Sequence, residues 1–122
     1  MLIAKSPTKD TLKASLCDLI AHSYGPESHH SVRRCLVDWI GCAIAGTRAE
    51  IAEILTVSLR IGPTGSDGSL LASARAIAAH DAALYNGTLG HSLDFDDEDA
   101  MMCGHPGAVV IPAVLAVAEE CD

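Results

Sequence analysis

The chain has few aromatic residues, although almost half of its residues are apolar. Aromatics make up 3% of the 122 residues, with one Trp, two Tyr and one Phe, against an apolar fraction of 49%. The apolar content is therefore largely Ala, Leu, Ile and Val, and such small, helix-favouring side chains predict closely packed helices. The length allows one domain with a real core, and the 20% charged fraction argues against disorder.

Positive charge is missing from the end of the chain. All eight Lys and Arg residues lie between Lys5 and Arg75, together with seven acids, whereas nine acids and no cation follow Arg75. Nucleic acid is not expected as a partner of such a surface. An anionic ligand bound near the later acids would need cations from another part of the protein.

Long hydrophobic runs and paired cysteines are also missing. The longest nearly uninterrupted apolar run, residues 108–118, contains Pro112 and falls far short of the ~20 residues that span a bilayer. No signal-peptide core is visible at the N-terminus. The five cysteines show no Cys-x-x-Cys spacing: Cys17, Cys35, Cys42, Cys103 and Cys121. We therefore predict free thiols, a cytoplasmic location and no membrane partner.

Apolar periodicity and turn residues predict an all-α, helical bundle-like domain over residues 1–122, with a flexible segment at 1–10. Asn86-Gly87 is expected to end one helix, and Pro112 to lie in or near the first turn of the last helix. The predicted helices cover residues 11–20, from Ser28 or Ser31 to Gly46, 51–59, 73–85, from Thr88 towards Asp94, and from Pro106 onward. The last pattern reaches Asp122 without a stop signal, which predicts a truncated piece of a longer protein with an uncovered apolar helix face.

Five carboxylates occupy six positions between His91 and His105: Asp94, Asp96, Asp97, Glu98 and Asp99. A calcium loop requires glycine where Asp99 stands, so that motif fails. A metal-dependent hydrolase of the His-Asp type stays open, with ligands expected from His80, Asp81, His91, Asp94 and His105.

Acid–base chemistry is the other catalytic reading of these residues. Histidine exchanges protons near neutral pH, and a neighbouring carboxylate orients the imidazole and favours its charged form. Asp94 and His105 flank a turn-sized acidic loop that can bring them together. The simpler alternative is that residues 96–99 form a solvated helix end. A Cys103–His105 nucleophile pair is disfavoured, since acidic neighbours raise a thiol pKa.

Three stretches resemble the MmgE/PrpD family, which includes 2-methylcitrate dehydratase and cis-aconitate decarboxylase. They are ALYNGTLGHSLDFDD (83–97), GHPGAVVIPAVLAVAE (104–119) and HSVRRCLVDWIGCAIAG (30–46). The resemblance covers most of residues 10–120 and concerns the N-terminal part of the family only. Glu98 stands where the family often has Thr, and His-Pro is followed directly by Gly107.

The resemblance implies an all-α domain that acts on small di- and tricarboxylates without a metal or organic cofactor. By position, His105 matches the catalytic histidine and Asp94 the active-site aspartate. Asn86, His91 and Asp97 fall on motif positions that shape the substrate pocket. Lysines, a second histidine and a lid domain would come from the missing C-terminal portion. We therefore expect a lyase fragment that is inactive alone, or a non-catalytic helical module that assembles with itself, as a homo-oligomer, or with a partner.

Overall fold

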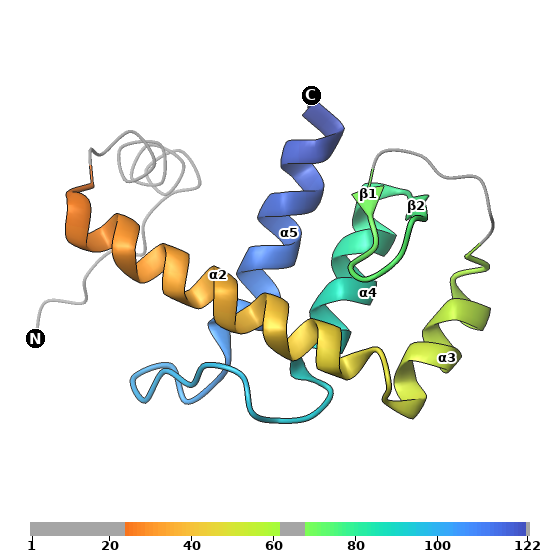
Figure 1. Cartoon of the computed structure of the whole chain (residues 1–122), viewed down its shortest axis with the longest axis horizontal. Helices are drawn as coiled ribbons and strands as arrows, with labels where there is room; N and C mark the ends of the chain where they lie inside the picture. The colour runs from red at the N-terminus through yellow and green to blue at the C-terminus, as the bar shows by residue number, and fades with distance from the viewer. Residues whose placement is uncertain (1–23, 62–67, 122) are drawn as a thin grey trace, which may run out of the picture. The chain divides into compact units, whose positions relative to one another are not determined.

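The computed structural model describes residues 24–61 and 68–121, and this part of the chain is mostly α-helical (Figure 1). The four helices are α2 (Pro26–Gly46), α3 (Glu50–Ser58), α4 (Ala79–His91) and α5 (Pro106–Cys121). Strands β1 (Gly68–Ser69) and β2 (Ala76–Ile77) form an antiparallel pair in which Gly68 faces Ile77. The predicted all-α class is confirmed. The helix predicted at residues 11–20 and the segment 1–10 lie outside the described residues.

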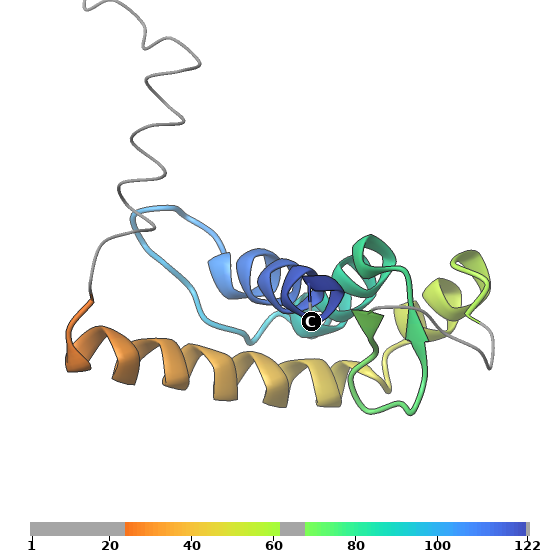
Figure 2. The same ribbon diagram turned by 90° about the horizontal axis from the view of Figure 1, so that it is seen from above.

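Helices α4 and α5 lie side by side, and α2 from Ser31 onward crosses them as a separate layer (Figures 1 and 2). The core forms where these helices meet α3 and the strand pair. Trp39 of α2 and Leu89 of α4 are its largest fully buried side chains. The core cluster comprises Trp39, Ala43, Ala52, Leu70, Ala82, Tyr85 and Leu89. Three alanines among seven residues agree with the expected packing through small side chains.

Two glycines of α4 allow the close approach of its neighbours. A Cβ on Gly87 would lie 2.7 Å from the Ala108 carbonyl oxygen of α5, and one on Gly90 would lie 2.5 Å from Trp39 Nε1 of α2. Pro112 has no N–H, so the Ala108 carbonyl has no helical partner at that position. This carbonyl faces Gly87 instead. The backbones of α4 and α5 can therefore come into contact because Gly87 has no side chain.

The helix boundaries around α4 differ from the prediction. Residues 73–78 form turns and β2 rather than a first helical turn, and α4 continues through Asn86-Gly87 to His91. Asn86 does not end the helix, because its side-chain amide forms hydrogen bonds with backbone groups outside the helix. Its Oδ1 accepts from the Leu71 N–H at 2.9 Å and its Nδ2 donates to the Ser69 carbonyl at 2.8 Å. Tertiary contacts therefore override the local turn signal.

Helix α5 begins at Pro106, as predicted, and Pro112 lies in its second turn, near the first turn as expected. The C-terminal end of α5 is tied to the strand pair, because the Ser69 N–H donates to the Glu119 carboxylate at 2.6 Å. Among the described helices, none has the length and apolarity needed to cross a membrane.

Candidate active site

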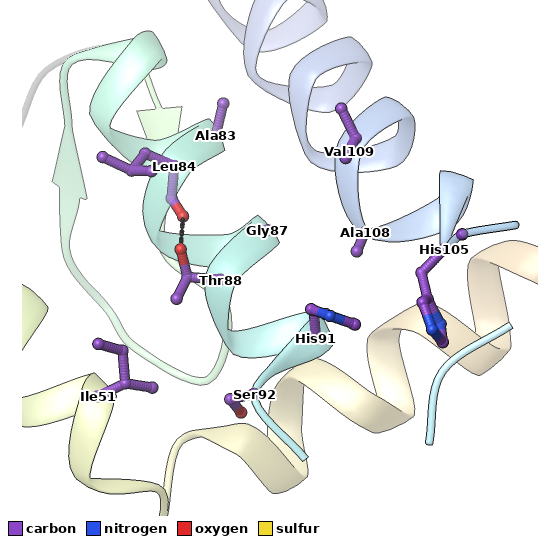
Figure 3. Close-up of a pocket in the computed structure, with 11 residues that line it drawn as sticks. Ile51, Ala83, Leu84, Gly87, Thr88, His91, Ser92, His105, Ala108 and Val109 are labelled. Atoms are coloured by element: carbon purple, nitrogen blue, oxygen red, sulfur yellow. Dashed lines mark hydrogen bonds between the residues drawn. The ribbon is translucent and has the colours of Figure 1, made fainter. Parts of the chain in front are cut away.

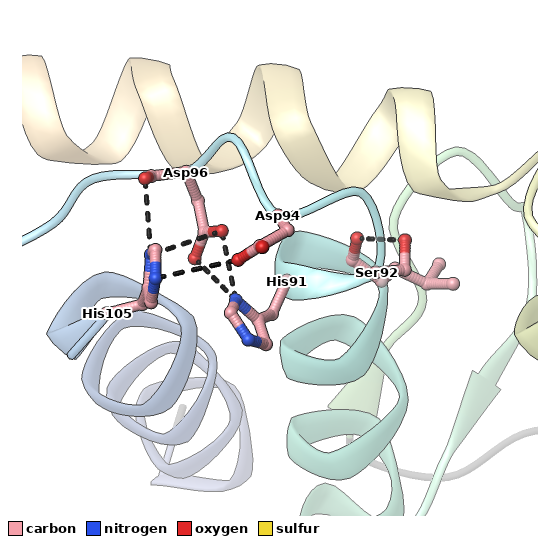
Figure 4. A network of polar contacts seen from close by, with 6 residues as sticks. His91, Ser92, Asp94, Asp96 and His105 are labelled. Carbon is pink, nitrogen blue, oxygen red and sulfur yellow. Dashed lines mark hydrogen bonds and ion pairs between the residues drawn. The ribbon is translucent and has the colours of Figure 1, made fainter.

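Two histidines and two aspartates meet where α4 ends and α5 begins (Figure 4). His91 is the last residue of α4, and His105 immediately precedes α5. Asp94 and Asp96 lie in the segment between the two helices, and their carboxylates approach the histidine rings. The ring centroids of the histidines lie 4.6 Å apart. We call these four residues the His–Asp cluster.

Asp96 lies at the centre of the His–Asp cluster. Its side chain has no exposed surface, and its Oδ1 and Oδ2 lie 3.0 and 3.3 Å from His91 Nδ1. The Oδ1 also lies 3.5 Å from His105 Nδ1. A buried carboxylate needs hydrogen-bond donors or positive charge, and both imidazoles turn a nitrogen towards it. Asp96 therefore orients both rings.

His105 is held in one tautomer by the backbone. Its Nδ1 lies 3.3 Å from the carbonyl oxygen of Asp96, which can only accept a hydrogen bond. In the neutral ring Nδ1 therefore carries the hydrogen, and Nε2 is left as the acceptor nitrogen. Nε2 faces the Asp94 Oδ1 at 3.7 Å, an ion-pair distance when the imidazole is charged. This arrangement suits acid–base chemistry at one defined atom.

Asp94 differs from Asp96 in both backbone and exposure. Its φ of 54° is left-handed, a region that aspartate tolerates better than most residues, and its N–H donates to the His91 carbonyl at 3.1 Å. The side chain is 82% exposed, whereas that of His105 is 25% exposed. The carboxylate therefore approaches His105 from the solvent side.

The two other sequence-predicted pocket residues, Asn86 and Asp97, form no hydrogen bond or ion pair with the histidine rings in the described part of the chain. Asn86 is buried, and both ends of its amide bind the backbone of residues 69–71. Asp97 packs against Gly107 in the first turn of α5. Its Oδ1 is buried and accepts no hydrogen bond from the described residues. The substrate-binding roles of Asn86 and Asp97 stay predictions.

The rest of the acidic segment forms a turn. Asp99 Oδ1 accepts from the N–H groups of Met101 and Met102, at 2.9 Å each, and the Asp99 and Gly104 backbones pair with each other. Asp99 therefore shapes the turn that returns the chain to His105. Cys103 in this turn is exposed, and its Sγ lies 3.5 Å from the Ala100 carbonyl.

A groove of about 810 Å³ runs between α4 and α5, with His91 and His105 at one end (Figure 3). Most of the groove is apolar, and its lining residues are Ile51, Ala83, Leu84, Gly87, Thr88, His91, Ser92, Gly104, His105, Ala108 and Val109. A ligand in this groove would reach both imidazoles.

The ligand set expected for a His-Asp hydrolase is only partly brought together. His80 and Asp81 pair at 3.4 Å in the first turn of α4, with the His80 side chain 82% exposed. His91 ends the same helix eleven residues later, about 16 Å away at the rise of an α-helix. His80 and Asp81 therefore cannot share one metal with His91.

Sequence reasoning did not identify Asp96 as a site residue. In an extended segment, successive side chains point to opposite sides, so Asp94 and Asp96 would share one side and Phe95 would lie on the other. The aromatic Phe95 would then be expected to face the interior. In the structure Phe95 is exposed and Asp96 is buried. The left-handed turn at Asp94 breaks the alternation, and the sequence carries no clear signal for that turn.

The described residues form a helical domain in which the His–Asp cluster lies at the junction of α4 and α5. The model of the MmgE/PrpD N-terminal domain matches residues 11–122, and the chain therefore belongs to the MmgE/PrpD family. This match confirms the resemblance seen in the sequence, including its restriction to the N-terminal part. No curated protein and no solved structure matched the chain.

Proposed function

We propose that the chain supplies the acid–base half of a lyase site for small di- or tricarboxylates, with chemistry like that of 2-methylcitrate dehydratase. The single observation that carries the proposal is the His105 ring. Its Nδ1 faces a backbone carbonyl, its Nε2 faces Asp94, and the ring borders the groove. Membership of the MmgE/PrpD family supports the same conclusion.

The proposed reaction removes a proton from the carbon next to a carboxylate and assists the departure of hydroxide. His105 Nε2 takes or returns the proton, because the tautomer leaves that nitrogen available. Asp94 stabilises the imidazolium that forms, and Asp96 keeps the ring in place. Decarboxylation of a related acid would use His105 to protonate the carbanion-like carbon instead.

Substrate carboxylates require positive charge that this end of the chain does not have. All Lys and Arg residues precede residue 76, and the ion pairs of the His–Asp cluster in the described residues involve only histidine as the cation. We propose that lysines or arginines from further polypeptide complete the site. The 122-residue chain alone is then expected to turn over neither 2-methylcitrate nor cis-aconitate.

The test combines the chain with the C-terminal portion of a MmgE/PrpD enzyme whose own N-terminal domain has been removed. We expect the mixture to dehydrate 2-methylcitrate or decarboxylate cis-aconitate. His105→Ala should lower kcat by about 10²–10⁴-fold, the usual contribution of a general acid–base residue. His80→Gln, in the first turn of α4 and remote from His105, serves as the control and should keep full activity. Unchanged turnover in His105→Ala would remove His105 from the catalytic role.

A second candidate is a non-catalytic module that assembles with another copy of the chain through α5. The observation that favours it is the row of exposed aliphatic side chains on this helix: Val109, Val110, Val114, Leu115 and Val117. The helix carries no cation, and its acids Glu119 and Glu120 lie at its end. An apolar surface of this kind is typical of a protein interface.

A further inference from the structure

Three metal-ligating groups converge in the His–Asp cluster. One nitrogen or oxygen from each of His91, Asp96 and His105 lies within 4.8 Å of the other two. The carboxylate oxygen Oδ1 of Asp96 is 3.0 Å from His91 Nδ1 and 3.5 Å from His105 Nδ1. Both imidazoles thus turn the same kind of nitrogen towards one buried carboxylate.

These separations suit a small divalent transition ion. Zn²⁺ binds imidazole nitrogen and carboxylate oxygen at about 2.0–2.2 Å, and tetrahedral geometry then separates neighbouring ligand atoms by about 3.4 Å. The two measured separations from Asp96 lie on either side of that value. All three ligand atoms lie within 4.8 Å of one another, and the His91 side chain is 49% exposed.

The surroundings of His105 resemble those of a metal-bound histidine. Such a histidine usually donates its second ring N–H to a carboxylate, which fixes the ring and raises its basicity as a ligand. His105 Nε2 faces Asp94 Oδ1 at 3.7 Å while Nδ1 faces Asp96. Asp94 can therefore support His105 as a ligand.

The charge around the cluster also favours a cation. Five carboxylates lie within residues 94–99, and no Lys or Arg follows Arg75 in the sequence. A bound divalent ion would reduce the mutual repulsion of these acids. Three protein ligands would leave a fourth position for water, and the exposed side of His91 gives the ion a route in.

We propose that His91, Asp96 and His105 form a binding site for a divalent transition ion of the zinc type. Binding places the metal on His105 Nδ1 and moves the ring hydrogen to Nε2, which faces Asp94 Oδ1. Acid–base chemistry at Nε2 requires the opposite tautomer. The metal and the proposed proton transfer therefore exclude each other, and only this consequence rests on the proposed function.

The test titrates the full chain with ZnCl₂ by calorimetry and with CoCl₂ by absorption spectroscopy, under reducing conditions. We expect one ion per chain. Asp94→Asn should weaken binding about tenfold, and His91→Gln or Asp96→Asn should weaken it more than about 100-fold. His80→Gln is the matched control and should bind like the parent chain. Circular dichroism checks that each variant is folded. Because the His91 side chain is half-exposed, its replacement should leave the packing of the core unchanged.

The spectrum of bound Co²⁺ distinguishes this site from the free thiols. Visible bands without a thiolate charge-transfer band are expected for nitrogen and oxygen ligands. Parent-like affinity in His91→Gln and Asp96→Asn, or a thiolate band, would overturn the proposal. Zinc should also inhibit the complemented enzyme. If zinc binds as expected but His105→Ala keeps full turnover, the metal site stands and the proposed lyase function fails.

Discussion

Asp94 and Asp96 carry the same side chain two residues apart, yet the surroundings of the two carboxylates differ. Asp96 is buried between two imidazoles, so it holds both rings. Asp94 is exposed in a left-handed conformation and approaches His105 Nε2. The backbone, rather than the residue type, therefore separates a buried carboxylate between the two rings from an exposed one beside His105.

Cys42 offers a second residue-scale test, because it lies buried in α2 close to the acidic segment. Burial raises the pKa of its thiol most, and the negative charges of Asp38, Asp96 and Asp97 raise it further. A raised pKa leaves less thiolate at any given pH, and the thiolate is the reactive form. We expect iodoacetamide at pH 8 to modify Cys42 at least about tenfold more slowly than Cys103.

Peptide mapping by mass spectrometry over time measures both rates, and unfolding in urea provides the control by exposing Cys42. Because its pKa is raised, the reactivity of Cys42 should increase only at pH values above the usual range of a thiol. Equal modification rates in the folded chain would contradict the burial of Cys42 beneath the acidic segment.

At the scale of elements, the site depends on how closely α4 and α5 pack. His91 ends one helix and His105 precedes the other, so the distance between the rings follows the distance between the helices. Gly87 sets that distance, because its missing side chain leaves room for the Ala108 carbonyl. Gly41 of α2, in contrast, has open space around it.

Gly87→Ala should therefore destabilise the chain by about 1–3 kcal/mol, since the new methyl group collides with backbone that cannot rotate away. Gly41→Ala makes the same chemical change at an exposed helical position. It should stabilise the chain by about 0.5–1 kcal/mol through helix propensity. Urea denaturation followed by circular dichroism gives both free energies of unfolding. A neutral or stabilising Gly87→Ala would show that the two helices do not pack closely at this point.

At the scale of the whole molecule, apolar and charged surfaces are unevenly distributed. Helix α5 exposes several aliphatic side chains. It also carries no positive charge, because no Lys or Arg follows Arg75 in the sequence. If α5 mediates self-association, placing like charges on it should prevent assembly, because each charge would be buried opposite its copy.

Val110→Lys combined with Val114→Lys places two charges one helical turn apart on α5. We expect analytical ultracentrifugation to show an oligomer for the parent chain and a monomer for this double variant. Val57→Lys, at an exposed position on α3, is the control and should leave the oligomer intact. A parent chain that sediments as a monomer at all concentrations would refute the assembly proposal.

The sequence by itself determined the helical class, the family, and the start of the last helix at Pro106. These features follow from local propensity, apolar periodicity and motif spacing, which act within a few residues. The sequence also singled out His105 and Asp94, and in the structure His105 Nε2 lies 3.7 Å from Asp94 Oδ1. The catalytic roles of these two residues stay predictions.

Only the tertiary structure decided the continuation of α4 through Asn86-Gly87, the pairing of residues 68–69 with 76–77, and the central position of Asp96. Each depends on a partner distant in sequence or on a single left-handed residue. Asn86 binds backbone fifteen and seventeen residues earlier, and Asp96 turns inward because the chain reverses at Asp94. Such contacts compete with local preferences only after the helices have packed, and residue order alone does not reveal the outcome.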